Sequence, residues 1–102
     1  MKPATVIPSK MTPAYTKVRS KHIRRLCLQH LDAVRPGLAT DHALLATIQA
    51  VYPKAELCEL QRELDYLALK GLLTTTDVAG VWQLRLTRQG VQRAERLAGQ
   101  ES

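Results

Sequence analysis

The segment 55–86 constrains the fold of this chain more than any other part of the sequence. Its first half, AELCELQRELDYLALK, carries leucines at 57, 60, 64 and 67, the i, i+3, i+7, i+10 spacing of one apolar helix face. Gly71 follows Lys70, and this pairing of a cation with a glycine is typical of a helix C-terminus. We therefore predict a helix that ends at Gly71 and whose leucine stripe is the centre of the core.

A β-hairpin is predicted directly after this helix. Residues 72–76 and 81–86 favour strands, and the four residues between them, Asp-Val-Ala-Gly, favour a turn. In the second strand Trp82, Leu84 and Leu86 alternate with polar residues, so they share one face. We expect this apolar face to close over the leucine stripe.

In the N-terminal third, the sequence pattern predicts a helix over residues 20–34, with Ser20 as its N-cap and Pro36-Gly37 after its end. Its inward side is expected to carry five residues: Ile23, Leu26, Cys27, His30 and Val34. Leu28 points elsewhere in this arrangement, which makes it a candidate contact in a dimer.

Two further helices complete the prediction. The first runs from about residue 41 to 52, with Thr40 or Asp41 as N-cap, and Pro53 breaks it. Only about three residues separate it from the helix that begins at 55, the spacing of a helix-turn-helix. The last helix covers residues 88–98 and is capped by Thr87.

Charge is distributed unevenly along the 102 residues, which are enough for one domain with its own core. Residues 1–35 hold eight cations and one acid, whereas residues 36–70 hold three cations and five acids. Residues 1–19 contain three prolines, so we expect a basic, disordered N-terminal arm, followed by a domain at 20–98 and a disordered tail at 99–102. The basic third favours a polyanionic partner.

Several classes of function are not indicated by the sequence. Cys27 and His30 lack a second ligand pair at metal-site spacing, and no phosphate loop or catalytic constellation is present, so we expect no metal, no cofactor and no enzymatic activity. No apolar run approaches the ~20 residues that span a bilayer, and no secretory signal is evident. These features favour a soluble cytoplasmic protein with reduced thiols.

Two segments carry a resemblance to a known family. ELQRELDYLALKGLL at 59–73 and LRLTRQGVQRAE at 84–95 resemble the segments around the wing of winged helix-turn-helix DNA-binding domains. More narrowly, RELDYL followed by RLTRQG is similar to small winged-helix proteins of Mu-like bacteriophages and prophages. The resemblance covers about residues 20–98. It implies a mainly α fold with a three-helix core, a two-stranded wing and a C-terminal helix, and a transcriptional regulator acting in a bacterial host cell.

The resemblance implies that the helix at 55–70 enters the DNA major groove. Arg62 is then placed to donate to guanine and Glu59 to accept from cytosine. The full set of residues that we expect at double-stranded DNA is Lys17, Arg19, Lys21, Arg24, Arg25, Glu59, Gln61, Arg62, Tyr66 and Arg85.

A second hypothesis arises because this helix is net acidic, and carboxylates repel phosphates. DNA binding then requires that Glu56 and Glu63 pair within the protein, or that the basic N-terminal third drives binding. The alternative is a winged-helix adapter that binds a protein partner through the same helix and the wing, without sequence-specific DNA binding. A homodimer is compatible with both hypotheses.

Overall fold

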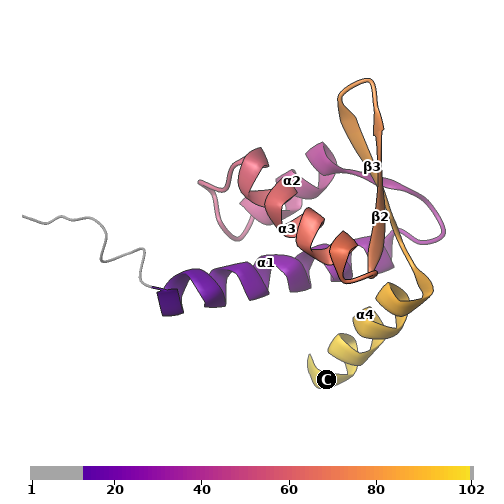
Figure 1. Ribbon diagram of the computed structural model, residues 1–102. Coiled ribbons are helices and arrows are strands. Elements are labelled where there is room, and N and C mark those ends of the chain that lie inside the picture. Colours follow the sequence, from indigo (N-terminus) through magenta and orange to yellow (C-terminus); the bar gives the residue numbers. More distant parts are fainter. Residues whose placement is uncertain (1–12, 102) are drawn as a thin grey trace, which may run out of the picture.

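The computed structural model describes residues 13–101 as a mainly helical fold with a small antiparallel sheet (Figure 1). The elements are α1 (Pro13–Ala33), β1 (Ala39–Thr40), α2 (Asp41–Gln49), α3 (Leu57–Leu69), β2 (Leu73–Val78), β3 (Val81–Leu86) and α4 (Arg88–Glu101). This order is compatible with the winged-helix arrangement that the resemblance implied. The part of the predicted arm at 1–12 lies outside the described residues.

Helix α1 is longer than the sequence pattern indicated. It begins at Pro13, a residue type favoured in the first helical turn, so residues 13–19 are helical although we expected them in the arm. Ser20 was predicted as the N-cap, and this is wrong. Ser20 lies inside the helix, and its hydroxyl donates to the Glu63 carboxylate on α3 at 2.8 Å. A contact with a segment 43 residues away leaves no local signal in the sequence.

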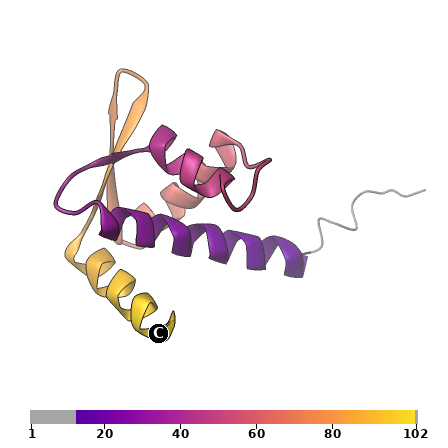
Figure 2. The same cartoon turned by 180° about the vertical axis from the view of Figure 1, so that it is seen from behind.

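Helix α1 lies between α4 on one side and α2 and α3 on the other (Figures 1 and 2). This position corrects the expectation for Leu28, which we predicted to point away from the core toward a dimer contact. Leu28 is 3% exposed and belongs to the core. The prediction was wrong because it assumed that only one face of α1 is covered by the rest of the protein. In the structure α4 packs on a second face of α1.

The leucine stripe of α3 is confirmed as part of the core. Leu60, Leu64 and Leu67 are buried and Leu57 is partly buried. Leu84 and Leu86 of β3 join the same cluster. However, β3 packs mainly on α1, α2 and α4, while α3 packs on β2. The apolar face of β3 therefore does not close over the α3 stripe as we expected, and faces other helices of the same core.

The sheet contains one strand that the sequence pattern did not reveal. Strand β1 has two residues and pairs antiparallel with β3, which gives the order β1-β3-β2. The hairpin turn is shorter than the predicted residues 77–80, because Val78 and Val81 pair directly. Its two residues, Ala79 and Gly80, both have positive φ, at 54° and 84°, as expected for the primed turns that connect twisted strands.

Helix boundaries shift by a few residues elsewhere. Helix α2 ends at Gln49 rather than residue 52, and α3 begins at Leu57 rather than 55. Thr40 is confirmed as the N-cap of α2, since its hydroxyl accepts from the Ala43 amide at 3.2 Å. Helix α4 continues to Glu101, so the prediction of a disordered tail from residue 99 is wrong through residue 101.

The end of α3 and the start of α4 are joined by hydrogen bonds. Gly71 has φ of 77°, and the amides of Gly71 and Leu72 donate to the carbonyls of Ala68 and Leu67, as in a Schellman C-cap. The Thr87 hydroxyl donates to the Gly71 carbonyl at 2.6 Å and accepts from the Gly90 amide at 3.1 Å. The predicted glycine stop and Thr87 cap are both confirmed, and they fix α4 to the end of α3.

Both cysteines are free thiols. Cys58 is exposed, and Cys27 is buried. Burial, together with the nearby charge of Glu63, raises the pKa of the Cys27 thiol to about 12. Within residues 13–101, no group of His, Cys, Asp and Glu is arranged to hold a metal ion, and none of the helices has the length and apolar character to span a membrane.

Candidate nucleic-acid interface

The acidic side of α3 is paired with cations of α1. Arg19 donates from Nε and Nη2 to the two carboxylate oxygens of Glu59, at 2.5 and 2.9 Å. The same guanidinium lies over the Tyr52 ring, 4.6 Å from its centroid. The hydrogen bond from Arg19 is the main reason that the pKa of Glu59 is lowered. This pair holds the N-terminal half of α1 against the start of α3.

A second pair lies one turn further along both helices. Arg24 Nε is 3.1 Å from Glu63 Oε1, and the side chain of Glu63 is only 8% exposed. Ser20 donates to the other Glu63 oxygen, and the Arg24 guanidinium lies 4.0 Å from the Tyr66 ring centroid. Of the two acids that we expected to pair internally, Glu63 does so. Glu56 is exposed, and its carboxylate accepts a 3.7 Å hydrogen bond from the Cys58 thiol.

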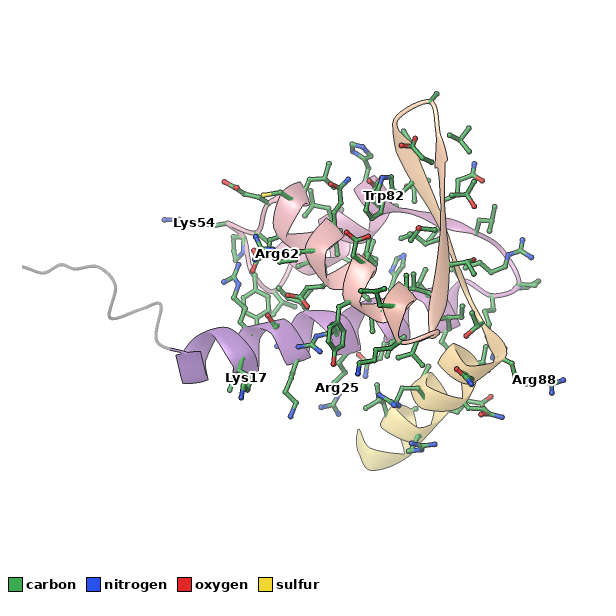
Figure 3. All side chains as sticks on the ribbon, in the orientation of Figure 1. Lys17, Arg25, Lys54, Arg62, Trp82 and Arg88 are labelled. Atoms are coloured by element: carbon green, nitrogen blue, oxygen red, sulfur yellow. The ribbon has the colours of Figure 1, made fainter. Side chains whose placement is uncertain are left out.

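The cations of α1 therefore divide between two sides of the helix. Arg19 and Arg24 face α3, where they neutralise carboxylates. Lys17 and Lys21 are exposed, and Figure 3 shows Lys17 and Arg25 on the side of α1 opposite α3. Of the five α1 cations that we expected at DNA, Arg19 and Arg24 are therefore engaged by carboxylates of α3.

The outward face of α3 is a stripe of four exposed residues at i, i+4, i+7 and i+11: Cys58, Arg62, Asp65 and Leu69. Arg62 is the one cation in this stripe, and within the described residues its guanidinium makes no hydrogen bond or ion pair. Tyr66 lies beside the stripe and is 42% exposed. Figure 3 shows Arg62 and Lys54 on the α3 side of α1, away from Lys17 and Arg25.

Gln61 is held by a residue that the sequence analysis did not include in the site. Its Nε2 donates to Oδ2 of Asp41 at 3.1 Å, and Asp41 is fully buried in the first turn of α2. From the sequence, Asp41 was predicted only as a possible cap, because nothing in the helical periodicity brings residues 41 and 61 together. Glu59 and Gln61 are thus hydrogen-bonded within the protein, whereas Arg62 acts on Glu59 only through its charge, which helps to lower the pKa of that carboxyl group.

The wing presents polar side chains and one cation. In the register of the hairpin, Thr74 lies opposite Arg85 and Thr76 opposite Gln83, so these four side chains share one face. Arg85 is exposed and is the single cation in residues 73–86. The tip at Asp77–Gly80 contributes no positive charge.

The Arg19–Glu59 pair predicts a pH-dependent contribution to stability. The pKa of Glu59 is lower in the folded state than its ordinary value of 4.5, so the stabilisation is present above that value and is lost as the pH falls through the folded-state pKa. In thermal unfolding followed by circular dichroism, Glu59→Gln should lower Tm at pH 7, and the difference from wild type should shrink at pH 3. Asp65→Asn, on the exposed stripe of the same helix, is the control. A Glu59→Gln deficit of equal size at both pH values would contradict the pairing.

Comparisons with known proteins support the fold. The chain is similar to the structure of Lactococcus lactis ZitR, a variant with two substitutions in its apo form, with a TM-score of 0.61 over 96% of this chain and 74% of that chain. Sequence identity is 13%, so the likeness shows a shared fold alone. No family model matches the chain. A search of curated proteins also finds no match.

Proposed function

We propose that this chain is a DNA-binding regulator that places the exposed stripe of α3 in the major groove. The observation that carries this proposal is the pairing of Glu59 and Glu63 with Arg19 and Arg24. The net acidic composition of α3 was the main argument against DNA binding. Because α1 supplies a guanidinium for each of these two carboxylates, the repulsion that they would exert on phosphates is largely removed.

In this proposal the predicted DNA contacts have different roles. Arg62 reads a guanine by donating two hydrogen bonds from its guanidinium, and Tyr66 lies beside it. Arg85, with the hydroxyls of Thr74 and Thr76, contacts the phosphate backbone from the wing. Arg19 and Arg24 act as positioning residues that orient α3. The remaining cations of α1 lie on the other side of that helix and contribute at most long-range attraction.

Substitution of Arg62 tests this assignment. Arg62→Ala should lose about 1–3 kcal/mol of discrimination at one base pair, because a bidentate arginine-guanine contact is removed. The measurement begins with selection of a preferred duplex from a random library, followed by titration of that duplex and its single-base variants at fixed salt concentration.

Arg88→Ala is the matched control, since Arg88 is an exposed arginine at the start of α4, away from the α3 stripe. This control should retain the sequence preference. Equal losses for all duplexes in both variants would contradict base reading by Arg62.

The type of regulator, its location and its oligomeric state are also proposals. The resemblance of RELDYL and RLTRQG to proteins of Mu-like phages supports a small phage or prophage transcriptional regulator that acts in the bacterial cytoplasm. We also propose a homodimer, because regulators of this size gain affinity when two copies bind paired half-sites. Sedimentation of the free protein and of its complex with a selected duplex tests the number of chains bound. A single chain on a site without internal repeat would contradict the dimer.

One observation favours the adapter as a second candidate. Leu69 is 88% exposed on the α3 stripe, and Val78 is 46% exposed near the wing tip. Apolar side chains at such positions are more common in protein interfaces than at phosphates. Absence of both an enriched sequence and a salt-dependent affinity in the library selection would favour this candidate over the regulator.

A further inference from the structure

A basic groove lies between α1, the end of α3 and α4. It has a volume of about 760 Å³. Five cations line it: Lys21, Arg24, Arg25, Lys70 and Arg93. Among the described residues that line this groove none is acidic, although Arg24 pairs with Glu63 just beneath the surface. Arg62, which we assign to DNA, does not line it.

The floor of the groove is apolar. Leu28, Leu67 and Leu72 are buried core residues, and Leu97 of α4 is partly buried beside them. Val18 is 66% exposed at one end. An apolar floor with cationic walls offers more than phosphate binding needs, because phosphate affinity comes from the cations.

We propose that this groove binds an acidic, amphipathic peptide segment of a partner protein. The positive charge of the groove favours an acidic occupant over the basic segments of this chain. Residues 1–12 contain Lys2, Lys10 and no acid, and α4 carries three arginines against two glutamates, so neither the N-terminal segment nor a second copy of α4 complements the cations. A partner helix with carboxylates on one side and leucines on the other complements both the walls and the floor.

The open shape of the groove also favours a peptide over a small molecule. Side chains from three helices contribute to it, and the cations lie on α1, directly after α3 and on α4. Small-molecule sites more often enclose their ligand and place only a few polar groups around it. The inference does not depend on the proposed DNA binding, because it uses neither Arg62 nor the wing, although Tyr66 and Arg24 also line the groove.

The test uses a fluorescent synthetic peptide of about 16 residues, long enough to form a helix on binding, with leucine on one face and glutamate on the other. Its anisotropy is titrated with the full chain. Two matched peptides separate the contribution of the negative charge from that of the apolar face. One replaces each glutamate with glutamine, and the other replaces each leucine with serine. Both should bind about tenfold more weakly than the parent, since each lacks one half of the complementarity.

Variants of the protein locate the binding site. The double variant K21E/R93E reverses two exposed cations of the groove and should weaken peptide binding about tenfold. K54E/R88E makes the same change in net charge at two exposed cations outside the groove, and should retain the wild-type affinity. Because all four residues are exposed, the circular dichroism spectra and Tm of both variants should match wild type.

Several results would overturn the proposal. These are absence of binding by the parent peptide, equal losses in the two double variants, or equal affinity for the three peptides. Inhibition of a self-association by the peptide, lost in K21E/R93E, would instead assign the groove to a second copy. Loss of duplex affinity in K21E/R93E without peptide binding would assign it to DNA.

Discussion

Arg24→Leu is expected to destabilise the protein by about 2–4 kcal/mol, because it leaves the Glu63 carboxylate buried with Ser20 as its remaining described hydrogen-bond partner. Leucine keeps part of the packing against Tyr66, so the loss reports mainly on the charge. Urea denaturation at pH 7, followed by circular dichroism, measures the change in the free energy of unfolding.

Two controls separate the ion pair from a general effect of charge. Lys21→Leu removes a neighbouring exposed cation of α1 and should change the free energy of unfolding by less than about 0.5 kcal/mol. The double variant Arg24→Leu/Glu63→Leu removes both charges and should recover most of the loss. An Arg24→Leu variant as stable as wild type would contradict the role of this pair in holding α1 on α3.

Gly90→Ala is the second substitution with a large expected effect. A methyl group at Gly90 would lie 1.9 Å from the carbonyl oxygen of Leu72 and 3.0 Å from a methyl of Leu86, so α4 must move away from the end of α3. That carbonyl also accepts from the Thr87 amide, which opposes the movement. We expect a loss of about 2–3 kcal/mol or more in the free energy of unfolding, measured by urea denaturation.

Gly99→Ala is the matched control in the same helix. No atom lies within 4 Å of a methyl group placed there, so this substitution should be neutral or stabilise the protein by up to about 1 kcal/mol through helix propensity. If Gly90→Ala were as stable as Gly99→Ala, the close approach of α4 to Leu72 would be wrong.

The elements that the sequence predicted well are those with local signals. Each of these signals depends on residues within a few positions of one another. They are the leucine spacing, the Gly71 stop, the caps at Thr40 and Thr87 and the two hairpin strands. The helix-turn-helix order follows from these signals. Side-chain periodicity and cap chemistry operate over one or two helical turns, so such features can be predicted from a single sequence.

The features that could not be predicted depend on contacts distant in sequence. Arg19 and Glu59 are 40 residues apart, and their pairing neutralises a carboxylate on a helix whose composition is net acidic. Strand β1 has only two residues and forms because Ala39 pairs with Leu84 on β3. Leu28 was misplaced for the same reason, since the second face of α1 is covered by a helix from the other end of the chain.

The candidate site was predicted in part. The sequence indicated α3 and the wing, and the structure leaves Arg62 and Arg85 exposed on these elements. It also indicated five DNA-contacting cations on α1. In the structure Arg19 and Arg24 pair with acids of α3, and Lys21, Arg24 and Arg25 line a groove shared with α4. In the proposed function, helix α1 positions the reading helix through Arg19 and Arg24.

The most direct test of the proposed function is amide chemical-shift mapping of the full chain with duplex DNA at low salt concentration. We predict that the amides of Cys58, Arg62, Asp65 and Leu69 shift together with those of Thr74 and Arg85, while those of Lys21 and Arg93 do not. No shift anywhere, or shifts confined to the groove of α1 and α4, would contradict the assignment of the α3 stripe to DNA.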